Sequence, residues 1–185
     1  ARVTTTVVAL PGQMMFAGDK LAELPAERLR LLQQALPVCD VRPLDLFPIF
    51  EMRPVWDLKI RRDFEAWDVV AVFNWSDADT DLEVRVGELG LPATHDYLLF
   101  EFWEKRFLGR THDLIRMRVP ARGTRLVAVQ PDRGRPQWLS DDRHLTQGGV
   151  DLEHLAWDAP SRRLNGRLRL VPHHPTEVRI FVPPG

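Results

Sequence analysis

Two patterns of apolar and polar residues divide the chain at residue 40. Beyond that point, apolar and charged residues alternate over short segments, and glycine or proline separates one segment from the next. Leu82, Val84 and Val86, for example, alternate with Glu83 and Arg85. A period of two is typical of strands that have one buried face. The pattern predicts a mainly β fold, an antiparallel two-sheet β-sandwich of eight or nine strands over residues 55–185.

The expected strands differ in how they are covered. Residues 69–73 form a continuous apolar run, which predicts a strand that is buried on both faces. Near the end of the chain, the alternation predicts that Leu170, Val178, Ile180 and Val182 face the core. The strands are expected at residues 55–61, 67–75, 82–86, 97–103, 115–119, 126–128, 150–157, 164–170 and 178–182.

The first 40 residues follow a different pattern. Residues 1–10 carry β-branched side chains that favour a strand, although Val3, Val7 and Leu10 also fit one face of a helix. Propensity alone leaves both interpretations open. The next apolar run, residues 14–17, predicts a short strand covered on both faces, as in a parallel sheet.

Residues 24–36 have the period of an amphipathic helix. Pro25 suits the first helical position, and Pro37 ends the helix because proline interrupts the hydrogen-bond pattern. The apolar positions recur at spacings of three and four and are expected to be buried; they are Leu29, Leu32 and Leu36. The polar positions, expected in solvent, are Arg28, Arg30, Gln33 and Gln34.

The domain organisation follows from what each part can bury. One strand and one helix cannot cover their own apolar faces, so residues 1–40 are expected to be a piece of a larger αβ domain placed against the sandwich. Three prolines divide residues 41–54, which predicts an extended linker. Uncovered apolar side chains in residues 1–40 would favour self-association or packing of this segment onto the sandwich.

Composition narrows the partners. The chain has 25 basic and 26 acidic side chains, so no net field attracts it to nucleic acid or to an anionic membrane. Its apolar runs are much shorter than the ~20 residues that span a bilayer. Cys39 is the only cysteine, which excludes an internal disulfide and a cysteine-based zinc site and favours a cytoplasmic location.

Several motifs, taken in order, resemble the α-galactosidase (melibiase) clan of glycoside hydrolases. The pair Gly18-Asp19 and the following residues 20–29 resemble the end of the catalytic barrel of those enzymes. The later motifs resemble their C-terminal sandwich domain; they are Arg42–Phe47, Trp56–Leu58, Val70–Trp75, Glu88–Leu91, Phe102-Trp103 and Arg143–Gly148.

The resemblance implies that residues 1–40 are a helix-strand-helix remnant of a (β/α)8 barrel. Residues 1–10 would be the seventh barrel helix, residues 13–18 the eighth strand and residues 24–36 the eighth helix. Barrel active sites lie at the carboxyl ends of the strands, and Asp19 follows such an end. In the family the matching aspartate lines the galactose pocket, so Asp19 would bind substrate in the complete barrel; a helix cap or a turn explains it equally well.

The residues for hydrolysis are not expected in this chain. Retaining glycosidases need two carboxylates across the scissile bond, and the resemblance places both on earlier barrel strands. Ser140, Asp141, Asp142 and His144 are interpreted as a turn rather than as a catalytic group. No catalytic residue, metal or cofactor is assigned. The sandwich carboxylates are expected on solvated faces or in charge pairs; they are Asp57, Asp63, Glu65, Asp68, Glu101 and Glu104.

Six tryptophans raise the question of sugar binding, because sugar rings stack on exposed indoles. Trp67 and Trp138 have polar or small neighbours and are the candidates for exposure, whereas Trp75, Trp103 and Trp157 end apolar segments and are expected in the core or at a junction. The predicted function is that of a non-catalytic C-terminal domain whose partner is the catalytic barrel. A carbohydrate-binding module with galactoside ligands and an oligomerisation module are the alternatives.

Overall fold

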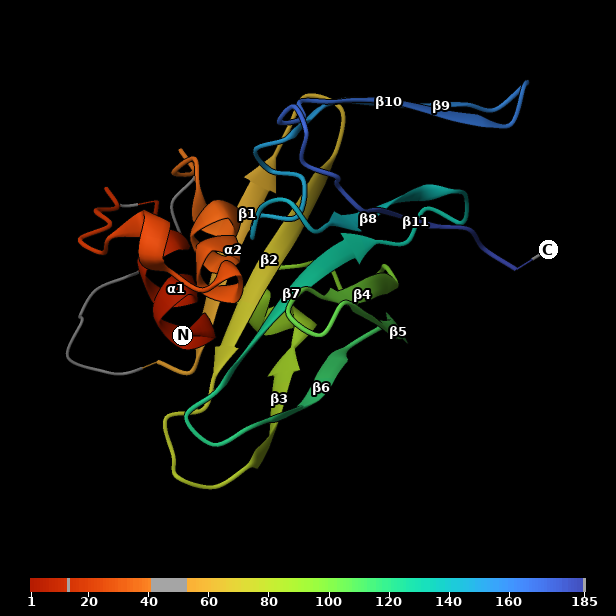
Figure 1. The fold of residues 1–185 in the computed structure, drawn as a ribbon. Coiled ribbons are helices and arrows are strands. Elements are labelled where there is room, and N and C mark those ends of the chain that lie inside the picture. The colour runs from red at the N-terminus through yellow and green to blue at the C-terminus, as the bar shows by residue number, and fades with distance from the viewer. Residues whose placement is uncertain (13, 41–52, 185) are drawn as a thin grey trace.

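A computed structural model describes residues 1–12, 14–40 and 53–184. It shows two short helices packed against a larger antiparallel β body (Figure 1). None of the described helices is long and apolar enough to cross a membrane. The helices are α1 Arg2–Ala9, η1 Leu21–Glu23, α2 Ala26–Ala35 and η2 Val86–Leu89.

The described residues form eleven strands, all in antiparallel pairs. A central five-stranded sheet has the order β1-β2-β7-β4-β5, and the ladders β3-β6, β8-β11 and β9-β10 have two strands each. The predicted antiparallel β class is therefore confirmed. In chain order, the strands are β1 Val55–Arg61, β2 Ala66–Phe73, β3 Thr80–Arg85, β4 Tyr97–Glu101, β5 Arg106–Thr111, β6 Leu114–Val119, β7 Thr124–Pro131, β8 Gln137–Asp141, β9 Leu152–Asp158, β10 Arg163–Leu168 and β11 Val178–Phe181.

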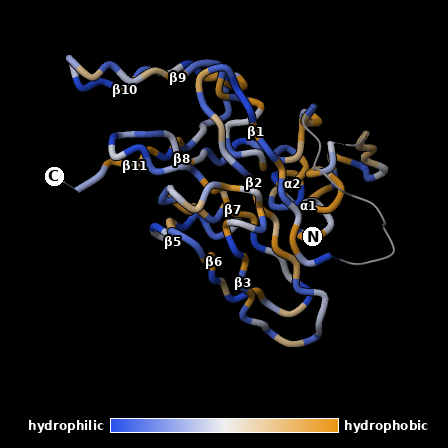
Figure 2. The backbone as a smooth tube through the Cα atoms, turned by 180° about the vertical axis from the view of Figure 1, so that it is seen from behind, coloured by the Kyte–Doolittle hydropathy of each residue, from blue (hydrophilic) through white to orange (hydrophobic). Residues whose placement is uncertain are grey.

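The central sheet is buried on both faces. Along β2, Val69, Ala71 and Phe73 belong to the core cluster that includes the helices, whereas Val70 and Val72 belong to the cluster that includes β3 and β6. Figure 1 shows the helices on one side of β2 and β7 and the β3-β6 ladder on the other, and Figure 2 shows apolar colouring concentrated along these elements. The predicted two-sided burial of residues 69–73 is confirmed.

α1 is a helix although threonine and valine make up most of its sequence. β-Branched residues are mediocre helix formers, so packing must supply the stability. Thr6 is fully buried and its hydroxyl donates to the carbonyl of Arg2 at 2.9 Å, while Leu10 just beyond the helix is also fully buried. Residues 1–10 therefore adopt the helix that the family resemblance implies, and the strand alternative is excluded.

Residues 14–17 do not form the predicted strand. A strand needs a neighbour for its N–H and C=O groups, and no strand among the described residues pairs with this segment. Met14 and Phe16 are instead 74% and 86% exposed. Gln13, the first residue of the implied barrel strand, lies outside the described residues, as does all of the predicted linker except Arg53 and Pro54.

Two strands lack a sequence signal. β5 is an edge strand in which Arg106, Gly109 and Arg110 interrupt any apolar alternation. β8 is buried along its whole length, including Gln137 and Ser140, so its polar residues do not mark a solvent face. Polar residues can be buried when they have hydrogen-bond partners. Alternation of apolar and polar residues therefore does not reveal a buried strand that contains them.

β11 presents the face opposite to the predicted one. Val178 and Ile180 are 42% and 40% exposed, and Val182 beyond the strand is exposed as well. Phe181 packs instead against the buried cluster of Leu98, Phe100 and Leu139. Leu170 is also exposed, so the prediction that these four aliphatic residues face the core is wrong. Alternation indicates that two faces differ, but the larger phenylalanine occupies the core side here.

Candidate functional site

The most informative site is the junction between α2 and the sandwich. α2 begins after Pro25 and ends before Pro37, close to the predicted bounds. It turns Leu31, Gln34 and Ala35 toward the sandwich core. Leu29 and Leu32 are only half-buried and Leu36 is 42% exposed, so the prediction that the helix buries these three leucines does not hold within this chain.

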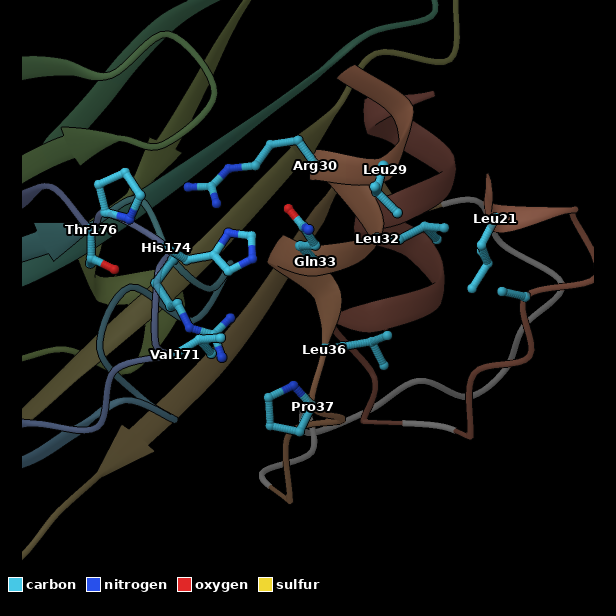
Figure 3. Close-up of a pocket in the computed structure, with 13 residues that line it drawn as sticks. Leu21, Leu29, Arg30, Leu32, Gln33, Leu36, Pro37, Val171, His174 and Thr176 are labelled. Atoms are coloured by element: carbon cyan, nitrogen blue, oxygen red, sulfur yellow. The ribbon is translucent and has the colours of Figure 1, made fainter. Parts of the chain in front are cut away.

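The three leucines line an open apolar groove of about 400 Å³. The groove is completed by Leu21 from η1 and by Val171 and Pro175 from the segment between β10 and β11. Figure 3 shows the leucine side chains projecting from one side of α2, while Arg30 and Gln33 project toward His174. We call this surface the leucine groove.

Hydrogen bonds from Gln34 and from Arg30, which also lines the groove, hold α2 to the sandwich. Gln34 Nε2 and Arg30 Nη2 donate to the carbonyl of Asp142 at 3.0 and 2.8 Å. The Leu145 N–H donates to the carbonyl of Gln34 at 2.8 Å, and the Arg30 guanidinium lies 3.1 Å from the Asp142 carboxylate. Arg30 and Gln34 were predicted to face solvent. That prediction is wrong, because both side chains form the polar side of the junction.

His144 joins the end of α2 to the loop between β8 and β9, residues 142–151. Its Nε2 lies 2.9 Å from the carbonyl of Pro37, and its Nδ1 lies 3.2 Å from the Thr146 N–H and 2.7 Å from the Thr146 hydroxyl. A carbonyl needs a donor and an N–H needs an acceptor, so the neutral ring with its proton on Nε2 fits both contacts. Burial lowers the pKa of His144 to about 4, against the opposing effect of the backbone carbonyls.

Buried carboxylates surround the same loop. Asp141 accepts the N–H groups of Arg143 and His144 at 2.9 and 3.2 Å. Burial, followed by repulsion from Asp151, raises the pKa of Asp141 to about 7. Burial also raises the pKa of Asp151, and the Arg143 guanidinium, 3.6 Å away, opposes that shift. The residues interpreted as a turn thus form a buried polar junction.

Trp67 and Trp138 support this loop from within the core. They are 1% and 2% exposed, so neither ring can stack on a sugar from solvent, and the prediction that they are exposed is wrong. Their indole N–H groups donate to the carbonyls of Thr146, at 3.4 Å, and Gln147, at 3.0 Å. Trp103 is buried, as predicted.

Asp19, the other predicted site residue, is exposed at a bend between Gly18 and η1. It does not belong to the lining of the leucine groove. Trp67 and Trp138 are buried in the core, so the structure does not join exposed Asp19 and these two rings in one exposed site.

The sandwich carboxylates serve structural pairs. Glu65, Asp68 and Glu101 are buried rather than on solvated faces. Lys59 bridges Asp68 and Asp57, with 2.6 Å between its Nζ and the Asp57 carboxylate. Burial, followed by repulsion from Asp68, raises the pKa of Asp57 to about 6. Neither carboxylate lines the leucine groove, and no group of three or more potential ligands that could hold a metal ion occurs among the described residues.

Comparison with known families finds one match within the sandwich. Residues 65–129, about a third of the chain, match the alpha galactosidase C-terminal beta sandwich domain. The resemblance to the melibiase clan is thereby confirmed for the C-terminal domain. No curated protein matches the sequence significantly.

Solved glycoside hydrolases share the fold. A GH27 β-L-arabinopyranosidase from Geobacillus stearothermophilus is similar with a TM-score of 0.58 and 20% identity over 72% of this chain and 30% of its own. α-Galactosidase I from Mortierella vinacea has a TM-score of 0.54 and 14% identity over 69% of this chain and 34% of its own. α-Galactosidase from Saccharomyces cerevisiae has a TM-score of 0.53 and 11% identity over 71% of this chain and 43% of its own. This chain thus spans about a third of the length of the first two structures.

Replacing Gly148 should show how tightly the loop packs on Trp138. Gly148 has a φ of +105°, and a Cβ there would lie 2.8 Å from Trp138 Nε1. We expect Gly148→Ala to lower the free energy of unfolding by ~3 kcal/mol, from backbone strain and overpacking together. Gly109→Ala is the matched control, because its φ is +103° and no atom lies within 4 Å of its Cβ. Equal losses in chemical denaturation would contradict the packing argument.

The neutral state of His144 should make the contribution of this residue to stability depend on pH. Between pH 6.5 and 4, the unfolded chain binds a proton at His144 that the folded chain excludes, so stability falls as pH falls, by ~3 kcal/mol in total. Asp141 has the opposite effect, because its raised pKa makes stability fall as pH rises from 4 to 7.

Comparison with His144→Asn isolates the histidine. We expect the stability difference between wild type and variant to shrink toward pH 4, with exposed His173→Asn as the control. NMR should show the His144 ring unprotonated at pH 5.5, and a protonated ring at that pH would refute the assignment.

Proposed function

We propose that this chain is the non-catalytic C-terminal part of an α-galactosidase-like glycoside hydrolase and that it stabilises the catalytic barrel. The match of residues 65–129 and the shared fold support the domain assignment. The observation that carries the proposal is the orientation of α2, whose polar side is bonded to the sandwich while its leucines line an open groove.

α2 packs Leu31 and Ala35 against the sandwich core but leaves Leu29, Leu32 and Leu36 in the open groove, where an isolated domain gains nothing from them. A surface helix normally turns its apolar stripe to the core and its polar side to water. Here Arg30 and Gln34 contact the sandwich, while Leu36 is 42% exposed. A second apolar body against the leucine groove removes the conflict. The strands of a barrel in which α2 is the last helix would provide that body.

The segment before α2 also exposes apolar side chains that a second apolar surface would cover. Phe16 is 86% exposed and Met14 74%, in the segment that the family resemblance aligns with the last barrel strand. Pairing with neighbouring barrel strands would supply both hydrogen bonds and apolar contacts. Asp19, three residues beyond Phe16, would then stand at the carboxyl end of that strand and contact the sugar, which is its proposed role in the complete barrel.

The proposal predicts different behaviour of the isolated chain and of the longer protein. The isolated chain should not hydrolyse an aryl α-galactoside, because the family resemblance places the carboxylate pair on earlier barrel strands. In the longer protein, Leu32→Asp should place a charge in the barrel contact, lowering the melting temperature and the active fraction together. Val182→Asp, on an exposed position of the sandwich, should change neither. An unchanged melting temperature in Leu32→Asp would contradict the proposal.

Without the barrel, the same surface should drive self-association. We expect the isolated 185-residue chain to form dimers or larger species at micromolar concentration, measured by size-exclusion chromatography with light scattering. Phe16→Ser combined with Leu32→Ser should shift the chain toward monomer. Dissociation by Val182→Ser instead would favour the alternative of an oligomerisation module on the sandwich, and a monomeric wild type would contradict both ideas.

A further inference from the structure

A second cavity, of about 520 Å³, lies where β4 begins and β7 ends. Leu91 and Pro92 contribute apolar surface to it. Asp132, Arg133 and Arg135, from the end of β7 onward, contribute polar groups. Its lining shares no residue with the leucine groove, so it needs an explanation of its own.

The charges around this cavity do not cancel. Arg133 Nε and Arg135 Nη2 lie 3.1 and 3.4 Å from the same oxygen of Glu65, whose side chain is 4% exposed. Two guanidinium groups therefore share one carboxylate. Asp132 does not compensate for the second charge, because Arg110 is bonded to its carboxylate. One positive charge is left over at the cavity.

Arg133 has the geometry to use that charge. Its Nε faces Glu65, the only ion-pair partner of its guanidinium among the described residues, and its side chain is 30% exposed. Arg135, by contrast, stacks over the Trp157 ring at 5.7 Å and donates to the Pro136 carbonyl at 3.1 Å. The free edge of a guanidinium donates two parallel N–H groups, which match the two oxygens of a carboxylate.

We propose that this cavity binds a small sugar acid, with the carboxylate of a uronic acid on Arg133 and its ring against Leu91 and Pro92. The volume suits one small ligand, and the mixture of a few polar groups with apolar surface is typical of ligand sites. The choice of a sugar rests on the proposed function; the choice of a carboxylate rests on the charges above.

The test is an NMR titration of the ¹⁵N-labelled 185-residue chain with D-galacturonate, and with D-galactose and acetate as matched probes. We expect saturable shifts at Ala66, Leu91 and His95 with galacturonate, at least tenfold weaker binding of both galactose and acetate, and weaker binding as salt is added.

Variants of Arg133 distinguish the effect of its positive charge from the effect of its paired N–H donors. Arg133→Ala should reduce galacturonate affinity at least tenfold, and Arg133→Lys should fall in between, because it keeps the charge and loses the paired donors. Arg135 still neutralises Glu65 in both variants, so the fold should persist. Arg122→Ala, which removes an exposed partner of Asp77, is the control that should bind normally.

Three results would overturn the proposal. They are absence of saturable binding, binding that is unchanged in Arg133→Ala, and equal affinity for galactose or acetate. These outcomes do not depend on α2. The proposed contact with the barrel is tested separately, by the Leu32→Asp variant in the leucine groove. The failure of one is therefore distinguishable from the failure of the other.

Discussion

The loop between β8 and β9 is the contact on which the arrangement depends. Thr146 and Gln147 are fully buried in it, and their carbonyls accept the indole N–H groups of Trp67 and Trp138. A buried polar group that loses its partner costs ~1–3 kcal/mol, so each of these hydrogen bonds stabilises the packing of the loop on the core.

Anchoring α2 by its polar side determines what the rest of the molecule exposes. Once Arg30 and Gln34 are bonded to Asp142, the helix cannot also turn Leu29, Leu32 and Leu36 to the core, because these three leucines lie on another side of the helix. The leucine groove follows from this geometry. The exposure of these leucines is the observation on which the proposed contact with the barrel rests.

The two cavities differ in chemistry. The leucine groove is apolar and suits a protein surface, whereas the cavity at Arg133 is cationic and has the size of a small ligand. Carboxylates with raised pKa values, such as Asp57 and Asp141, belong to buried networks away from both linings. A perturbed pKa marks a functional candidate only when the group also faces a space that substrate can enter.

Much of the fold could be predicted from local pattern. The antiparallel class, the two-sided burial of β2 and the bounds of α2 between Pro25 and Pro37 depend on neighbouring residues, whose periods and prolines are visible in the sequence. β5 and β8 were not predictable in this way, because edge position and buried hydrogen bonds hide the alternation.

The candidate site was far less accessible to sequence reasoning. Periodicity shows that α2 and β11 have two unlike faces, but partners distant in the chain select the face that is buried: Asp142 for Gln34, and Phe100 for Phe181. The burial of Trp67 likewise depends on a loop about 80 residues later. Neighbouring residues determine whether a segment forms a helix or a strand. Which face of that element is buried is decided by the assembled core, because each buried polar group needs a partner there.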